Sequence, residues 1–263
     1  MKYFIRLSYN GALFSGWQSQ LNAPSVQAEL EKAFKVLCKE EIKIVGAGRT
    51  DSCVNAINYV AHTQILSPVP QKGAAKRDFL YKLNAILPIS IRVHNIFPVP
   101  EQAHARFDAL SRTYQYFITL TPDPVLSKFA FYVKAPQIDF EAMNEAAGEF
   151  IGKKDFKSLQ KVGSDNKTTI CTVKEAYWRK AKVGEPFNAV EKGEIWVFTV
   201  TADRFLRNMV RAMVGSLLEV GTHRRGKEWI AQMIKKRSRC AAGASVPGNA
   251  LFLTKIEYPF KIK

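Results

Sequence analysis

The sequence predicts an α+β protein of two α/β lobes, each with a mostly antiparallel sheet, around a basic central cleft. Segments with the two-residue periodicity of strands alternate with segments of helical periodicity along the 263 residues. A proline-rich stretch at 98–102 interrupts this pattern and indicates two domains, 1–103 and 104–263. The 39 Lys and Arg outnumber the 23 Asp and Glu, which gives a formal net charge of +16. This charge is typical of a nucleic-acid-binding protein, and a merely soluble basic protein is the alternative.

The first lobe begins with alternating apolar and polar side chains over 3–9, which predict a strand. Asn10-Gly11 then predicts a turn. Ser25 is suited to cap a helix over 26–37, because apolar residues recur there at helical spacing. Three further elements complete this lobe: a strand at 42–47, a helix at 74–86 that ends before a proline, and a strand at 91–97.

The second lobe opens with another alternating segment at 112–120, in which Tyr114 and Tyr116 share one face. We interpret Tyr116 as a core residue. Helical patterns and strand patterns then follow one another to the end of the chain. The expected helices are 139–151, 203–220 and 227–237, and the expected strands are 169–179, 194–202 and 251–258.

Cysteine usage and apolar runs bear on the compartment. The four cysteines stand far apart without a C-x-x-C pair, which is neither a disulfide framework nor a zinc pattern. Arg6 and Ser8 interrupt the apolar N-terminal residues, so no signal peptide is visible. No apolar run approaches the roughly 20 residues that a membrane span needs. We therefore expect a protein of the reducing cytoplasm without a membrane segment.

The segment 203–220, if helical, has two unlike faces. One face is apolar, and the other carries arginines, whose planar guanidinium suits phosphate and carboxylate better than lysine does. A glycine on the arginine face indicates that another group approaches closely. Both a groove-facing stripe and a solvated charged face fit this pattern. The stripe consists of Arg204, Arg207, Asn208, Arg211 and Gly215.

One acidic residue, Asp51, follows an apolar strand segment in this strongly basic chain. A carboxylate at that place would repel polyanions unless it had a specific task or a cationic partner. An isolated Asp in a loop is most often a turn or N-cap residue. Taken alone, the residues around Asp51 therefore favour the turn or N-cap interpretation.

Short motifs follow one another along nearly the whole chain. They are Tyr9-Asn10-Gly11, Ser15-Gly16-Trp17-Gln18-Ser19-Gln20, Val26–Glu31, Gly48-Arg49-Thr50-Asp51, Leu83-Asn84 with Leu87-Pro88, His104–Phe107, Ser111–Tyr116, Phe205–Arg211 with Val214-Gly215, and Ala250–Leu253. Each motif alone is weakly specific. In this order they resemble the tRNA pseudouridine synthase A (TruA) family.

The resemblance implies the pseudouridine synthase fold and an isomerase. The reaction would convert uridine to pseudouridine in the anticodon stem-loop of tRNA, at tRNA positions 38, 39 and 40. The resemblance also implies a homodimer, with each RNA spanning both subunits, and no metal or cofactor. A non-catalytic RNA-binding protein or RNA chaperone with an impaired synthase site is the alternative. A metal-dependent nuclease would need clustered carboxylates or histidines, and Asp51 has none close in sequence.

By this resemblance Asp51 corresponds to the catalytic aspartate, and Arg211 to the cleft arginine that is its partner. A carboxylate suits the reaction because it can attack carbon as a nucleophile and then depart. Attack on C1′, attack on C6 and a mainly proton-handling role all remain open. An arginine beside Asp51 would favour its ionised form.

The resemblance also assigns substrate contacts. Tyr114 corresponds to the base-contacting tyrosine, and Arg49 to the arginine that fills the gap left when the target base leaves the stack. Extruding a stacked nucleotide costs a few kcal/mol, so such a wedge is useful. Arg204 and Arg207 are candidates for phosphate contacts that do not read sequence.

The loop that carries Asp51 departs from the family's usual pattern. Cys53 stands where the family usually has Gly, and Asn55 where it usually has His. A glycine there suggests special backbone angles or a close approach. Asn10 likewise replaces the more usual Asp. These changes bear on the rate and on the choice of uridine more than on the reaction class.

Overall fold

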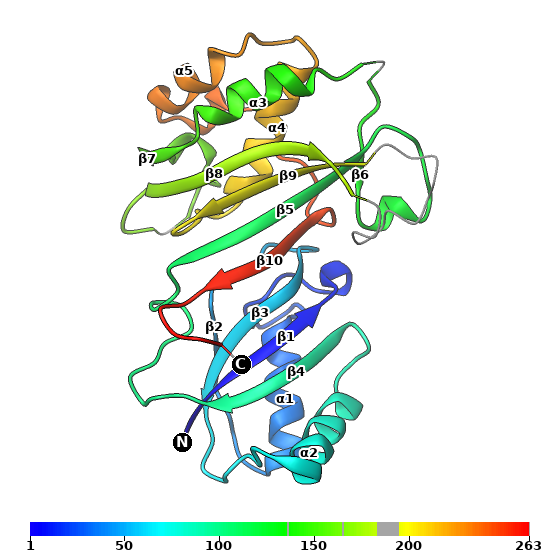
Figure 1. Ribbon diagram of the computed structural model, residues 1–263, viewed down its shortest axis with the longest axis vertical. Helices are drawn as coiled ribbons and strands as arrows, with labels where there is room; N and C mark the ends of the chain where they lie inside the picture. Colours follow the sequence, from blue (N-terminus) through cyan, green and yellow to red (C-terminus); the bar gives the residue numbers. More distant parts are fainter. Residues whose placement is uncertain (136, 165, 183–194, 263) are drawn as a thin grey trace. The chain divides into compact units, whose positions relative to one another are not determined.

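The computed structural model describes residues 1–135, 137–164, 166–182 and 195–262 (Figure 1). Contacts divide the chain into two compact units. Unit 1 is Met1–Leu110 with Leu253–Lys263, and unit 2 is Ser111–Phe252. Each contains a mostly antiparallel sheet with helices, so the predicted α+β class is confirmed. The domains 1–103 and 104–263 stay a prediction, and residue 263 lies outside the described residues.

Unit 1 is built on a sheet in which β1 is flanked by two antiparallel neighbours. Ile5 of β1 lies opposite Ala61 of β3 and Ile96 of β4. The short strand β2 pairs antiparallel with β3, and β10 is the next strand beyond β3. The strands are β1 (Lys2–Tyr9), β2 (Ile44–Gly46), β3 (Asn55–Gln64), β4 (Ile91–Pro98) and β10 (Leu251–Glu257), of which Leu253 onward belongs to this unit.

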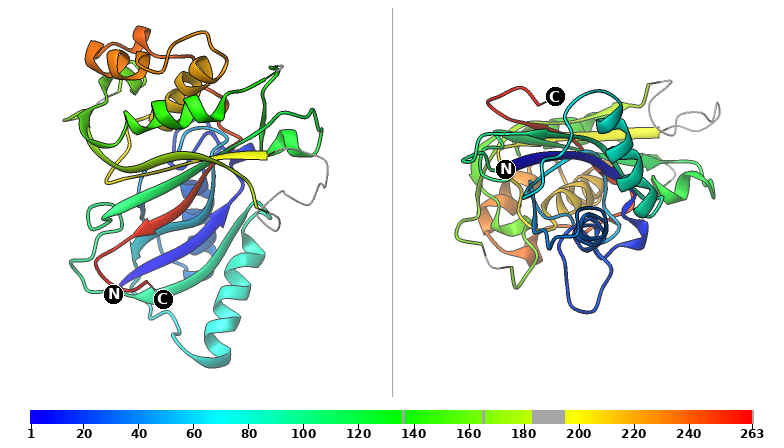
Figure 2. Two further views of the ribbon diagram at one scale, coloured as in Figure 1. Left: turned by 45° about the horizontal axis from the view of Figure 1, so that its top comes forward. Right: turned by 90° about the horizontal axis from the view of Figure 1, so that it is seen from below.

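Two predicted helices of unit 1 are confirmed, namely α1 (Val26–Cys38) and α2 (Gly73–Ile86). The hydroxyl of Ser25 accepts the Ala28 N–H at 3.2 Å, so Ser25 caps α1 as expected. The right-hand view of Figure 2 shows α1 end-on against one side of the strand layer. Within α2, all of which is described, Leu83 is the one buried residue. Most of α2 therefore faces solvent.

Strand β3 is absent from the sequence-based expectations, although it lies beside β1, β2 and β10. Its side chains from Tyr59 to Thr63 are all buried. Both faces of this stretch are covered, so the alternation that marks a half-buried strand is lost. Burial on both faces therefore explains the missed strand.

One hydrophobic core of unit 1 forms around Phe4 of β1. The Phe4 ring contacts Tyr258 edge-on at 5.5 Å and Phe97 at 6.1 Å between centroids. The Tyr258 hydroxyl donates to the Ala105 carbonyl at 2.5 Å. The last residues of the chain thus cover part of this sheet face.

Unit 2 contains a sheet of order β5-β9-β8-β7 in which neighbours are antiparallel, and β6 pairs parallel with β5. The strands predicted at 112–120 and 169–179 are confirmed. The strand predicted at 194–202 is confirmed from residue 195, because residue 194 lies outside the described residues. The elements are β5 (Ser111–Thr119), β6 (Phe131–Tyr132), β7 (Gly152–Asp155), β8 (Ile170–Lys180), β9 (Ile195–Ala202), α3 (Phe140–Gly148), α4 (Met209–Gly221) and α5 (Trp229–Lys236).

Helix α4 begins at Met209, so the prediction of a helix from residue 203 is wrong at its start. Asn208 has φ 68°, a left-handed conformation that interrupts a right-handed helix. The Asp203 carboxylate accepts the N–H groups of Thr172 and Arg204 at 2.8 and 2.7 Å, which holds the preceding segment in a turn. Arg204 therefore lies before the helix and not on a helical stripe.

The described part of the chain contains no helix with both the length and the apolar character needed to cross a membrane. All four cysteines carry free thiols.

Candidate active-site residues

Asp51 lies in the loop between β2 and β3, and its neighbours fix the backbone of that loop. Thr50 is buried, with its hydroxyl 2.9 Å from the Tyr9 hydroxyl. The Thr50 carbonyl accepts the Trp17 N–H at 3.3 Å, and the Asp51 carbonyl accepts the Val54 N–H at 3.2 Å. The side chain of Asp51 is half-buried. The loop therefore presents a half-buried carboxylate on a backbone that neighbouring hydrogen bonds anchor.

Two glycines of the N-terminal motifs allow the segment before α1 to pack against this loop. A Cβ atom on Gly11 would lie 2.2 Å from the Val54 carbonyl oxygen. A Cβ atom on Gly16 would lie 2.3 Å from the Thr50 carbonyl oxygen, and Gly16 also has φ +105°. Side chains at either position would displace the backbone next to Asp51.

The unusual residues of the loop have structural roles. Cys53 has φ 64°, so the special backbone angle expected at this position is present. Its N–H donates to the Phe14 carbonyl at 3.2 Å. Asn55 is 3 % exposed, and its Oδ1 accepts the Gly11 N–H at 2.9 Å. Asn10 keeps a capping function, because its Oδ1 accepts the Ala12 N–H at 3.0 Å.

Two aromatic side chains, Trp17 and Tyr59, pack beneath the backbone that leads into the loop of Asp51 and hold it in place. The Trp17 ring stacks on the Tyr59 ring at 4.1 Å between centroids. The Tyr59 hydroxyl donates to the Gly48 carbonyl. Arg49 follows Gly48 and is exposed, two residues before Asp51. The loop thus combines a fixed base with an arginine that projects into solvent.

In unit 2, the two tyrosines of β5 differ in environment. Tyr116 is fully buried, and its hydroxyl donates to the Pro247 carbonyl at 2.9 Å, which confirms it as a core residue. Burial raises the pKa of Tyr116, and the positive charge of Arg211 opposes this rise. Tyr114 is half-buried and meets the Phe205 ring edge-on at 5.1 Å, with 86° between the ring planes. The Tyr114 ring is thus partly exposed and packs edge-on against Phe205.

Arg211 lies in the first turn of α4 and is half-buried. Its Nε donates to the Val246 carbonyl at 2.7 Å, and its own carbonyl accepts the Val246 N–H at 3.3 Å. The first bond orients the guanidinium, and the second joins the backbone of α4 to the segment 242–248.

The segment 242–248 is the structural feature that sequence reasoning missed. A Cβ atom on Gly215 would lie 1.7 Å from the Ala244 carbonyl oxygen. The close approach inferred from Gly215 is therefore made by the chain's own backbone and not by a ligand. Ser245 accepts hydrogen bonds from Asn208 at 2.6 Å and from Arg239 at 2.9 Å. The Pro247-Gly248 dipeptide, a turn signal, was the available indication of this segment.

The two candidate phosphate contacts lie in the turn before α4. Arg207 is exposed, and its carbonyl accepts the Lys161 N–H at 3.0 Å. Arg204 is half-buried beside Cys171. Burial raises the pKa of Cys171 to about 12, and the charge of Arg204 opposes this rise. Their position in a turn removes the helical-stripe argument for both arginines, and their contacts with phosphate stay a prediction.

The predicted site residues divide between the two units. Asp51 and Arg49 share one loop of unit 1, whereas Tyr114 and Arg211 belong to unit 2. The pairing of Asp51 with Arg211 stays a prediction.

Comparison with known proteins identifies the family. A family model described as tRNA pseudouridine synthase matches residues 146–259. The chain is 44% identical to tRNA pseudouridine synthase A of Parabacteroides distasonis, over 98% of this chain and 96% of that protein. It is 42% identical to the protein of the same name from Porphyromonas gingivalis, over 98% and 97%. The corresponding protein of Chlorobaculum tepidum is 35% identical, over 97% and 96%. The chain therefore belongs to the tRNA pseudouridine synthase A family.

Proposed function

We propose that this protein is a tRNA pseudouridine synthase that isomerises uridine in the anticodon stem-loop of tRNA, at tRNA positions 38, 39 and 40. Relatives named tRNA pseudouridine synthase A align with nearly the whole chain. The observation that carries the proposal is the loop of Asp51, in which Thr50 and Val54 anchor the backbone while the carboxylate stays half-exposed.

In the proposed reaction, Asp51 acts as the nucleophile: a carboxylate oxygen bonds to C1′ or C6 of the target nucleotide, and that bond breaks again before the product leaves. The N1–C1′ bond breaks, the uracil turns, and a C5–C1′ bond forms. The C5 proton is lost and N1 gains a proton, so the product is an isomer of the substrate. Arg211 is the proposed cationic partner of Asp51. Its guanidinium is oriented by Val246, which favours a fixed ion pair over a mobile one.

The target nucleotide must leave its stack to reach a carboxylate. Arg49 is exposed and stands two residues from Asp51, which suits it to fill the vacated space. The half-buried ring of Tyr114, oriented by Phe205, would stack on the extruded uracil. Its hydroxyl is the proposed relay for the C5 proton.

We further propose that the two units form lobes on either side of a basic cleft that binds RNA, with phosphate contacts from Arg204 and Arg207. The formal net charge of +16 supports a polyanionic substrate. A homodimer in the cytoplasm completes the proposal.

Release of tritium from tRNA labelled at C5 of uridine tests this function directly. The wild-type protein is expected to release tritium, and Asp51→Ala is expected to release none while still binding tRNA. Asp51→Asn provides a control that keeps the shape of the side chain. If the wild-type protein released no more tritium than Asp51→Ala while both bound RNA, the protein would be a non-catalytic RNA-binding protein or chaperone.

A further inference from the structure

Unit 1 carries a row of cations that the proposed reaction does not use. It runs along helix α2 and the edge strand β4 and includes one residue near the C-terminus. Two hollows, of about 260 and 410 Å³, lie along this row. We call it the basic strip; its members are Lys72, Lys76, Arg77, Arg92 and Lys261.

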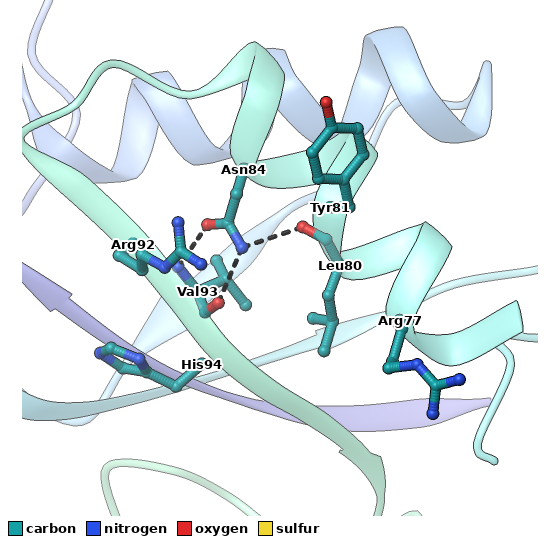
Figure 3. A pocket seen from close by; sticks show the side chains of 7 residues that line it. All are labelled: Arg77, Leu80, Tyr81, Asn84, Arg92, Val93 and His94. Atoms are coloured by element: carbon teal, nitrogen blue, oxygen red, sulfur yellow. Dashed lines mark hydrogen bonds between the residues drawn. The ribbon is translucent and has the colours of Figure 1, made fainter. Parts of the chain in front are cut away.

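The first hollow lies between α2 and β4. Figure 3 shows Arg92 and His94 on the strand, and Arg77 and Tyr81 on the helix. The second hollow lies further along β4, where lysines surround the apolar side chains of Phe97 and Phe260. Among the described residues, no Asp or Glu lines either hollow. Both hollows are therefore suited to anions.

No carboxylate neutralises the basic strip. In the described parts of the chain, none of its five cations has a carboxylate oxygen within ion-pair distance. Asp78, the one acidic residue of α2, pairs with Lys82 at 2.7 Å. Burial lowers the pKa of His94, and the charges of Arg6 and Arg92 lower it further. Arg6 therefore adds a further positive charge next to the strip. A bound polyanion would relieve this mutual repulsion.

The edge of β4 is closed to another strand at its centre. The side-chain amide of Asn84 donates to the Val93 carbonyl at 2.9 Å and accepts the Val93 N–H at 2.8 Å. These are the main-chain groups that an added strand would use. A second copy of this chain that packed its own strip against this one would also bring like charges together. Recognition by side chains of a polyanion fits better than either kind of protein contact.

The position of the strip relates it to the loop of Asp51. Ile91 at the start of β4 lies opposite Tyr9, and Tyr9 lies opposite Ala56 at the start of β3, shortly after that loop. From Arg92 to Pro98, β4 extends about 20 Å away from this end of the sheet. That length accommodates several consecutive phosphate groups of an RNA strand.

We propose that the basic strip binds phosphate groups of a tRNA segment outside the anticodon stem-loop. This inference rests on the proposed function, because it assumes that tRNA is the substrate. The strip adds affinity for the whole tRNA without reading its sequence, since phosphate contacts position a nucleic acid and do not discriminate bases.

The test compares two RNAs and two charge-reversed variants. Lys72→Glu/Arg77→Glu changes exposed residues at the N-terminal end of α2, one beside each hollow. Negative charge near a helix N-terminus is favourable, so α2 is expected to remain folded. The matched control is Lys32→Glu/Lys153→Glu, which alters exposed residues of α1 and β7 and changes the net charge equally. Dissociation constants are measured at several salt concentrations for full-length tRNA and for the isolated anticodon stem-loop.

For Lys72→Glu/Arg77→Glu we expect the Kd for full-length tRNA to rise about tenfold or more, and the salt slope to fall by about two. The Kd for the isolated stem-loop and the tritium-release rate at saturating tRNA are expected to stay unchanged. The control variant is expected to raise the Kd for the two RNAs equally and only weakly. The neutral variant Lys72→Gln/Arg77→Gln should give a smaller loss for full-length tRNA in the same direction.

Three outcomes would overturn the inference. Unchanged affinity for full-length tRNA would mean that the strip does not contact RNA. Equal losses for both RNAs would place the contact within the stem-loop. An altered oligomeric state with unchanged RNA affinity would assign the strip to a protein interface. Failure of the proposed function gives a separate signal, because the wild-type protein would then release no tritium from either RNA.

Discussion

The main-chain N–H of Gly11 donates a hydrogen bond of 2.9 Å to Oδ1 of Asn55. Both residues are buried, and the bond joins the N-terminal motif to the loop that carries Asp51. Position 55 usually holds His in the family that this sequence resembles, and in this chain the Asn55 amide oxygen is the acceptor. The loop of Asp51 is thus held by a residue that looks like a departure from the family pattern.

Replacing Asn55 with Ala should destabilise the protein. The Gly11 N–H would lose its acceptor in a buried place, which costs about 1–3 kcal/mol. Chemical denaturation measures this loss, and tritium release should fall with it because the loop is no longer fixed. Asn55→His, which retains an acceptor nitrogen, should recover part of both. Equal stability of Asn55→Ala and the wild-type protein would contradict this role.

The left-handed backbone of Cys53 predicts a difference between two substitutions. Cys53→Val should destabilise the fold by about 1–3 kcal/mol, because a β-branched residue is strained at positive φ. Cys53→Gly should remain within about 1 kcal/mol of wild type, since relief of strain offsets the greater freedom of glycine in the unfolded chain. Urea denaturation of both variants provides the measurement. Similar stabilities for Val and Gly would argue against a left-handed conformation at this position.

Gly215 predicts a packing defect that reaches Arg211. A methyl group at residue 215 would collide with the Ala244 carbonyl, so Gly215→Ala should cost about 1–3 kcal/mol. The displaced segment includes Val246, which orients Arg211, and tritium release should therefore fall as well. Gly148→Ala is the matched control, because a Cβ atom there meets nothing within 4 Å. If the two variants were equally stable, the tight packing against Ala244 would be refuted.

His62 makes stability depend on pH. Its pKa is lowered from 6.5 to about 4, first by burial and then by the charges of His104 and Lys2. Its Nδ1 accepts the Ala105 N–H at 3.1 Å, which requires that nitrogen to be unprotonated. As the pH falls, His62 therefore binds a proton at a higher pH in the unfolded chain than in the folded protein. This contribution is fully present above pH 6.5 and is lost as the pH falls from 6.5 towards 4, by up to about 3 kcal/mol.

Denaturation of the wild-type protein and of His62→Gln across this pH range tests the assignment to His62. The variant should have lower stability at pH 7 and a flatter pH dependence between 6.5 and 4. A variant with the same pH dependence as the wild-type protein would show that other groups are responsible.

Periodicity and local side-chain chemistry account for the elements that the sequence predicted. Ser25 caps α1 through a contact only three residues away, and the apolar spacing after it requires nothing beyond the helix itself. Strand β3 escaped this reasoning because its middle is buried on both faces. The start of α4 escaped it because Asn208 adopts a left-handed conformation. Asp203 accepts the N–H of Thr172, and Ser245 accepts a hydrogen bond from the side chain of Asn208, so both bonds join residues that are far apart in the chain.

The α+β class, most of the helices and strands, and the family indicated by the ordered motifs can be predicted from the amino-acid sequence. These properties depend on local periodicity and on short motifs, which are present in the linear chain. The fold was needed to show what the glycines at 11, 16 and 215 approach, why Cys53 and Asn55 fit the loop of Asp51, and which cations of unit 1 lie together without a carboxylate. Those properties arise when segments far apart in the chain come into contact, and contact geometry cannot be deduced from spacing along the chain.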